Sequence, residues 1–177
     1  MRVRVIIFIF SSFLLTCSCN NNGTPPVTIN SDSLKEPLEK ANKHMIKVEN
    51  EDIANYIRRH EWNMKTTGTG LRYMIYKQGT GSQAEPGDSV VINYKVNLIN
   101  GIECYSSKET GPLRFLTGKS DVINGLEEAV LLMKVGDNAK VIIPSHLAYG
   151  LLGDEEKIPK RATLVYDIEL TMVKKTK

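Results

Sequence analysis

A short amphipathic helix with no helical neighbour in the same region constrains most strongly how this 177-residue chain folds. Between Val122 and Gly136 one face of the predicted helix is apolar, with residues spaced i, i+3, i+4 and i+7: Leu126, Ala129, Val130 and Met133. Asn124 is expected to cap the helix and Glu127 to complete a capping box, and Gly136 follows its end. Such a helix must bury its apolar face against another element. The residues that follow, 139–143, predict a strand that Pro144 ends.

Alternating apolar residues on either side of that helix supply the sheet. The clearest alternation runs over residues 90–98, where every second side chain is apolar or aromatic, Tyr94 among them. Asn100-Gly101 then predicts a hairpin, and its loop length decides whether Cys104 or Tyr105 faces inward, so both alternatives stay open. The closing strand places five residues on one side: Leu164, Tyr166, Ile168, Leu170 and Met172. With strands near 71–76 and 113–115, we expect an α+β domain in which a twisted antiparallel sheet of about five strands wraps over one short helix.

The amino terminus has the features of an export signal. Arg2 and Arg4 precede an apolar run over residues 5–15, which has the length of a signal-peptide core and is too short to span a membrane in the mature protein. The run ends in two closely spaced cysteines, and this pattern resembles a bacterial lipoprotein signal, in which an acylated cysteine becomes the first residue. We assign acylation to Cys19, which Ser18 precedes, rather than to Cys17. The alternative is an ordinary secretory signal in which both cysteines are incidental.

These features divide the chain into a lipoprotein signal peptide over 1–18, a tether over 19–45, a helical extension over 46–67 and the main domain over 68–177. The tether is rich in Asn, Thr, Pro and Ser, a composition typical of exposed linkers. No aspartate follows Cys19, so we expect a lipid anchor in the outer membrane of a bacterial envelope, with the domain facing the periplasm. The helical extension either packs on the domain or mediates self-association.

Charge and residue types exclude several functions. The formal net charge is +3 and falls to +1 when Arg2 and Arg4 leave with the signal, which is too little for an electrostatic claim on nucleic acid. The sequence has no nucleophile–base set, phosphate-binding loop or zinc-ligand spacing, so we expect neither a cofactor nor a metal. The run Asp154-Glu155-Glu156 is expected to be a solvated loop.

Three tyrosines remain as candidates for a binding site. Tyr94 and Tyr166 lie on inward strand faces, and Tyr149 lies in a loop among glycine and apolar residues. Any one of them alone is better explained as part of the core. Together with neighbouring apolar residues, they are also suited to line an apolar concavity with a few hydroxyl groups, which is the usual form of a binding pocket.

Several motifs in the main domain carry a family resemblance: Val122-Ile123-x-Gly125-Leu126-Glu127-Glu128, Ala148-Tyr149-Gly150, Ile158-Pro159 and the run Ala-Thr-Leu-Val-Tyr-Asp-Ile-Glu-Leu over 162–170. Over roughly residues 68–174 they resemble the FKBP-type peptidyl-prolyl cis-trans isomerases, the macrolide-binding immunophilins. The signal, the helical extension and Tyr105-Ser106-Ser107 are in addition similar to envelope lipoproteins of this family that are associated with gliding motility in Bacteroidetes-type bacteria.

The resemblance implies an FKBP-like fold with a prolyl pocket. By position, the catalytic residues are Tyr94, Cys104, Tyr105 and Tyr149, and the substrate-binding residues are Leu113, Val122, Ile123, Leu126, Ile158 and Tyr166. In the family, the Ile123 N–H and the Tyr149 hydroxyl hydrogen-bond carbonyl groups of the ligand. This chain departs from the family pattern at a usual Phe-Asp pair, a floor tryptophan and two wall phenylalanines, where it has Cys104-Tyr105, Leu126, Leu113 and Tyr166.

The function that the resemblance implies is rotamase activity on X–Pro bonds of exported proteins. The implied partners are proline-containing polypeptides and the membrane that holds the lipid, without nucleic acid. The departures from the family pattern suggest reduced activity and leave two alternatives. One is a catalytically weak module that binds proline-containing segments as a chaperone, and the other is an accessory component of a gliding or secretion machine.

Overall fold

The fold comes from a computed structural model that describes residues 31–119 and 122–175, with side chains from residue 35 onward. The predicted signal peptide, Cys19 and the first part of the predicted tether lie outside these residues. In chain order the elements are α1 (Ser31–Arg59), β1 (Lys65–Thr66), β2 (Arg72–Lys77), β3 (Ser89–Leu98), β4 (Glu103–Ser106), α2 (Ser107–Thr110), β5 (Leu113–Leu116), α3 (Asn124–Leu131), β6 (Asn138–Ile143), the 3₁₀ turn η1 (Ser145–Leu147) and β7 (Leu164–Lys174).

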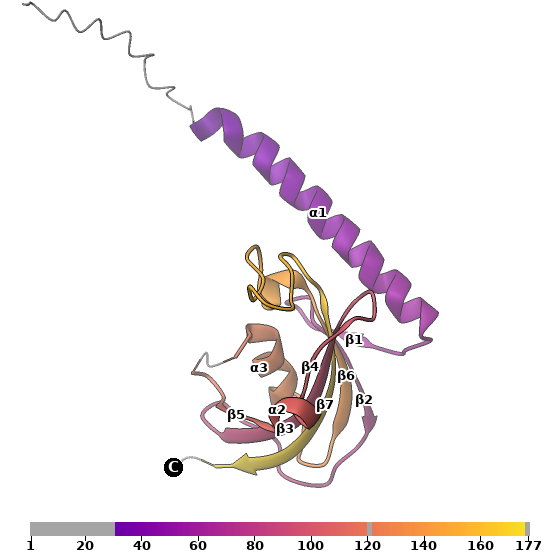
Figure 1. Ribbon diagram of the computed structural model, residues 1–177, viewed down its shortest axis with the longest axis vertical. Coiled ribbons are helices and arrows are strands. Elements are labelled where there is room, and N and C mark those ends of the chain that lie inside the picture. Colours follow the sequence, from indigo (N-terminus) through magenta and orange to yellow (C-terminus); the bar gives the residue numbers. More distant parts are fainter. Residues whose placement is uncertain (1–30, 120–121, 176–177) are drawn as a thin grey trace, which may run out of the picture.

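The strands form one antiparallel sheet in the order β1–β2–β6–β7–β3–β4, which curves around α3 (Figure 1). One edge of β3 pairs with β7 along its whole length. The other edge pairs with β5 through residues 89–92 and with β4 through residues 95–97. The sheet has seven strands, including the two-residue β1, where the sequence predicts about five. The expected α+β architecture, an antiparallel sheet over one short helix with a helix before it, is confirmed.

Helix α3 lies against the inner face of the sheet and closes the main core. Its apolar stripe is buried as predicted: Leu126, Ala129 and Val130 belong to the helix, and Met133 follows it. These side chains pack with inward residues of the strands, including Val90, Ile92, Val96, Val141, Ile143, Leu164, Ile168 and Leu170. The burial of one apolar stripe on one sheet face explains why so short a helix is stable here, since helices of this length are marginal alone.

The amino-terminal cap of α3 differs from the prediction. Ile123 is the cap residue, with an extended backbone (φ −60°, ψ 142°), and no side chain caps the helix. The predicted capping box between Asn124 and Glu127 is therefore wrong. The Glu127 carboxylate instead accepts a hydrogen bond from the N–H of Gly118 and so ties α3 to the loop after β5. A contact nine residues away, which the local pattern does not indicate, takes up that carboxylate.

A β-bulge decides the orientation of Cys104 and Tyr105. The hairpin at Asn100-Gly101 is as predicted, with the Leu98 N–H donating to Ile102 O at 2.8 Å. Opposite the turn, Val96 pairs with Tyr105 and the register then shifts, so that Cys104 is the extra residue. The bulge buries Cys104 and also leaves Tyr105 in contact with the core.

A second bulge reverses the faces at the end of β7. Val91 pairs with Met172 and Ile92 pairs with Leu170, so Thr171 is the extra residue. Its hydroxyl donates to Val91 O at 2.9 Å. The prediction that Met172 shares the buried face is wrong: Met172 is 47% exposed, and Val173 packs against the core in its place. Strict alternation fails wherever one strand carries an unpaired extra residue.

Helix α1 is a continuous element of 29 residues. Residues 31–45, predicted as part of the tether, are helical, so the helix begins earlier than the expected extension at 46. Its carboxyl-terminal end packs on the outer face of the sheet, where Ile53 and Tyr56 bury against Ile142 and Val165. The amino-terminal part projects beyond the sheet (Figure 1). Among the described residues, no helix combines the length and the apolar character that a membrane span requires.

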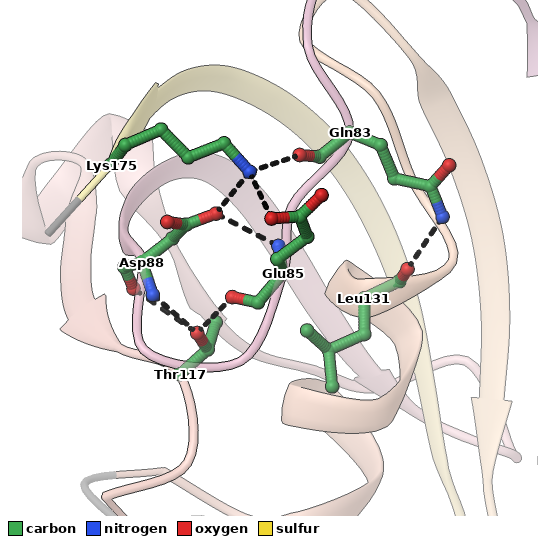
Figure 2. A network of polar contacts seen from close by, with 6 residues as sticks. All are labelled: Gln83, Glu85, Asp88, Thr117, Leu131 and Lys175. Carbon is green, nitrogen blue, oxygen red and sulfur yellow. Dashed lines mark hydrogen bonds and ion pairs between the residues drawn. The ribbon is translucent and has the colours of Figure 1, made fainter. Parts of the chain in front are cut away.

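A polar network fastens the end of β7 to the segment before β3 (Figure 2). Lys175 Nζ lies 2.8 Å from Glu85 Oε2 and 3.0 Å from the Oδ2 atom of buried Asp88. The same Oδ2 atom accepts from the Glu85 N–H, and the Thr117 hydroxyl donates to Glu85 O at 2.7 Å. From the other side of this segment, the Gln83 amide donates to Leu131 O at the end of α3. The network therefore joins the last strand, the segment before β3 and α3.

The close approach of α3 to β6 predicts the effect of adding one methyl group. A Cβ at Gly125 would lie 2.3 Å from Ile143 Cγ2, and Ile143 is fully buried and cannot move aside. Alanine favours a helix over glycine by about 1 kcal/mol, but overpacking costs about 1–3 kcal/mol. We expect Gly125→Ala to lower the free energy of unfolding in urea by about 1 kcal/mol or more. Gly68→Ala is the matched control, because nothing lies within 4 Å of that site; a stabilised Gly125→Ala protein would contradict the close contact.

Candidate functional site

The residues predicted to form a site come from five separate segments, and the structure gathers all but one into the main core cluster. Four are buried, four come from strands or α3, and the remainder border the core: Tyr94, Cys104, Tyr105, Leu113, Val122, Ile123, Leu126, Ile158 and Tyr166 all belong to the cluster. The exception, Tyr149, lies at 37% exposure in the loop between β6 and β7. Proximity is thus established, while the individual roles stay predictions.

Three of the tyrosines converge from different elements. The rings of Tyr94 on β3 and Tyr166 on β7 lie 6.4 Å apart between centroids, at 34°. Burial raises the pKa of the Tyr166 hydroxyl, and the nearby Tyr149 and Tyr94 raise it further. Burial also raises the pKa of Tyr149, with contributions from Asp154 and Tyr94. All three therefore remain neutral hydrogen-bond donors at physiological pH.

The hydroxyl groups of these tyrosines differ in whether they already have partners. The Tyr94 hydroxyl lies 3.0 Å from Thr110 Oγ1, and the Tyr105 hydroxyl donates to Asp154 Oδ2 at 2.6 Å. By contrast, the hydroxyls of Tyr149 and Tyr166 make no hydrogen bond to any other residue between 35 and 119 or 122 and 175. These two donors are available to a ligand.

Asp154 organises the loop that carries Tyr149. Its Oδ1 atom accepts from the backbone N–H groups of Glu156 at 3.0 Å and Ile158 at 2.7 Å, and its Oδ2 atom accepts from Tyr105. The Asp154 N–H in turn donates to Ile158 O at 3.0 Å. These bonds hold Ile158 in the core and fix the loop to β4 by a charge-assisted hydrogen bond, the stronger class.

The same contacts set the ionisation of this part of the site. Burial opposes the charge on Asp154, but the hydrogen bonds from Tyr105 and Ile158 outweigh it, so the pKa of Asp154 is lowered. The hydrogen bond to Asp154 is the main cause of the raised pKa of Tyr105. Burial, reinforced by Asp154, raises the pKa of the Cys104 thiol. The site therefore contains one firmly ionised carboxylate beside neutral hydroxyl and thiol groups.

The expectation that residues 154–156 form a solvated loop is wrong for Asp154. An aspartate whose side chain accepts from the N–H two residues on forms an Asx turn, and the glycine at 153 (φ +78°) precedes it as such turns allow. This local signal was present in the sequence. The partner on β4, Tyr105, is 49 positions away and could not be inferred from spacing.

The start of α3 forms the floor of the candidate site. Ile123 caps the helix and is half-buried, and Leu126 is almost fully buried beneath it. Gly125 allows the helix to approach Ile143 and Leu147 closely. In the part of the chain that the structure describes, no group of three His, Cys, Asp or Glu side chains is arranged to hold a metal ion. The arrangement is thus a set of apolar surfaces with hydroxyl groups at their edge.

Comparison with known proteins identifies the class to which this fold and site belong. The profile of the FKBP-type peptidyl-prolyl cis-trans isomerases matches residues 80–171, more than half of the 177-residue chain. The chain therefore belongs to the FKBP-type peptidyl-prolyl cis-trans isomerase family.

Within that family the chain is similar to bacterial FkpA proteins. The probable FKBP-type peptidyl-prolyl cis-trans isomerase FkpA of Neisseria meningitidis is 44% identical over 111 residues, which cover 62% of this chain and 40% of that protein. FkpA of Escherichia coli (strain K12) is 43% identical over 116 residues, 64% of this chain and 42% of that protein. The crystal structure of FkpA from Escherichia coli superposes with a TM-score of 0.61 at 33% identity, covering 83% of this chain and 74% of that one. The chain thus spans about two-fifths of the length of these curated relatives.

The contacts of Asp154 predict a pH-dependent stability. Since its folded-state pKa lies below the ordinary 3.8, the stabilisation is fully present above that value and is lost as the pH falls through the lowered pKa. We expect Asp154→Asn to lower the free energy of unfolding by about 1–2 kcal/mol at neutral pH. The difference from wild type should shrink in urea titrations at acid pH. The neighbouring Glu155→Gln is the control, and a deficit that stays constant with pH would contradict the assignment.

Proposed function

We propose that this protein accelerates cis–trans isomerisation of X–Pro peptide bonds in exported polypeptides. The observation that carries the proposal is the convergence of Tyr94, Tyr149 and Tyr166 over Leu126, with two hydroxyl groups left without partners among the described residues. Membership of the isomerase family supports the same reaction. The chain matches only part of its curated relatives, so activity and substrates are proposed for it rather than transferred.

The reaction requires no acid, base or nucleophile. Rotation about an X–Pro bond has a barrier of about 20 kcal/mol because the planar amide is stabilised by resonance. The twisted amide has lost that resonance, so its oxygen is less negative and its nitrogen less positive. Apolar walls therefore disfavour the planar ground state relative to the twisted form and lower the barrier. Leu113, Leu126 and Ile158 supply such walls.

Hydrogen-bond donors at the edge of these walls would position the substrate. The Tyr149 hydroxyl and the backbone N–H of Ile123 are proposed to bind carbonyl groups on either side of the proline. Each contact that is stronger in the twisted state by about 1.4 kcal/mol raises the rate tenfold. Asp154 contributes indirectly, since it holds the loop that carries Tyr149 against β4.

A second candidate function is supported by the composition of the walls. Cys104, Leu113 and Leu126 are smaller or less aromatic than the residues usual in the family, which leaves less surface to enclose a prolyl ring. The site would then bind proline-containing segments without accelerating their isomerisation appreciably. A protease-coupled isomerisation assay distinguishes the two, because binding alone gives no rate above background.

Loss of the Tyr149 hydroxyl tests the proposed site. Removing one hydrogen bond worth about 0.5–1.5 kcal/mol predicts that Tyr149→Phe lowers kcat/KM on a short proline peptide by about three- to tenfold. Tyr76→Phe is the control: Tyr76 loses a hydroxyl that donates to Asp167 at 2.8 Å on the outer face of the sheet, with no expected effect on turnover. An unchanged rate in Tyr149→Phe would place the site elsewhere, and a folded wild-type protein without activity would reject the enzyme.

We further propose that the protein is a lipoprotein of a bacterial envelope, anchored through Cys19. The support is the sequence of the first 19 residues, with paired arginines, an apolar run and Ser18 before the cysteine. Association with a gliding or secretion machine is proposed on the sequence resemblance alone, because the relatives named above carry no such designation.

Substitution of the cysteines tests the anchor. We expect Cys19→Ala to abolish incorporation of labelled palmitate and to release the protein from the membrane fraction, since an acyl chain contributes about 0.8 kcal/mol for each buried methylene group. Cys17→Ala is the matched control and should remain acylated. Acylation lost only in Cys17→Ala would show that the neighbouring cysteine is the anchor, and acylation of neither would leave an ordinary secretory signal.

A further inference from the structure

A groove lies between α1 and the loop after β6, next to the candidate site. Figure 1 shows this orange loop beside the middle of α1. The groove encloses about 780 Å³, within the range of sites that bind organic ligands. The residues that line it come from the two sides: Asn42, His44, Met45, Ile46, Val48, Glu49 and Asp52 from α1, and Ser145, His146, Gly150, Leu151 and Arg161 from η1 and the loop. We call it the α1 groove.

The walls of the α1 groove hold apolar side chains that water reaches. Ile46 is 55% exposed on α1, and Leu151 is 67% exposed on the opposite wall. Met45 and Val48 are also exposed, and Leu152 adjoins the groove at 82% exposure. Large apolar residues gathered on one surface usually mark an interaction site rather than a solvated face. Methionine in particular adapts to apolar partners of varied shape.

The α1 groove is held open by polar contacts between α1 and the body of the domain. The Glu49 carboxylate accepts from the Ser145 N–H and from the Thr163 hydroxyl, each at 2.7 Å. On the other side of the groove, the Arg161 guanidinium donates to Asn42 Oδ1 at 3.4 Å. These contacts fix the distance between the helix and the loop, so the groove exists before a partner binds.

The same loop borders the α1 groove and the candidate prolyl site. Tyr149 belongs to the site, whereas Gly150 and Leu151, the next two residues, line the groove. The Arg161 N–H donates to Gly150 O at 2.7 Å, and Gly150 N–H donates to Ser145 O at 2.9 Å. A chain bound at Tyr149 therefore reaches the groove by crossing a single rigid rim. This continuity identifies the occupant better than apolarity alone.

We propose that the α1 groove binds an apolar, extended segment of the same polypeptide whose proline occupies the candidate site. The proposal rests on the proposed function and adds the class of substrate: unfolded chains with an apolar stretch near the proline, rather than short peptides. Binding of that stretch adds affinity without touching the isomerised bond. It would lower KM for long substrates and leave kcat on short ones unchanged.

The test compares two labelled peptides that share one proline core, one of them extended by an apolar segment. We expect the wild-type protein to bind the extended peptide at least tenfold more tightly by fluorescence anisotropy. Ile46→Glu and Leu151→Glu, one on each wall, should abolish that difference and leave turnover of the short peptide unchanged. Ile102→Glu is the matched control, because Ile102 is equally exposed at 58% on the β3–β4 hairpin and lies outside the groove.

The outcomes separate this proposal from the proposed function. Equal affinity of wild type and both groove variants for the extended peptide, in proteins with native circular dichroism, overturns the groove assignment whatever the activity. Absence of turnover of the short peptide in wild type rejects the isomerase and leaves the groove result readable by anisotropy. If Ile46→Glu instead dissociates a dimer in sedimentation and keeps its affinity for the extended peptide, the groove is a contact between copies of this chain and the proposal fails.

Discussion

The packing of α3 into the concave face of the sheet is the contact on which the rest of the structure depends. The helix buries one stripe, centred on Leu126 and Val130, against strands drawn from the whole domain. Because Gly125 has no side chain, the start of the helix comes directly against Ile143 and Leu147. That close approach presents Ile123 and Leu126 as a floor, and the loops at this end of the sheet have only to supply the edge. A deeper or longer helix would fill the space that a ligand needs.

Function and stability draw on the same residues to different extents. Tyr94, Tyr105 and Tyr166 are all attached to strands and contribute to the core, but only Tyr149 stands on a loop. The carboxylate of Asp154 gives that loop a fixed position without filling the space between the tyrosines. The floor is thus stabilised by apolar burial and the edge by a few directed hydrogen bonds. Such a division lets the edge change between related proteins while the floor is kept.

The periodic parts of this fold could be predicted from the sequence, and the bulges and long-range contacts could not. The apolar stripe of α3 and the alternation in β3 follow from local spacing, so both elements were predicted. Met172 was misplaced because an extra residue, Thr171, reverses the faces of β7. The cap of α3 was misassigned because Glu127 bonds to a loop rather than to its own helix. The start of α1 was placed late because its amino-terminal half has no buried face to give it a pattern.

The hydrogen bond between Tyr105 and Asp154 has a consequence for how the sequence can diverge. The family usually carries an acid at position 105, whereas here a phenol occupies that position and the acid comes from the opposite loop. Restoring the ancestral aspartate at 105 alone would set two negative charges against each other. Changing 154 alone would leave the phenol without its acceptor. The two positions, 49 residues apart, are therefore expected to change together across lineages, and each single step is less fit than either end point.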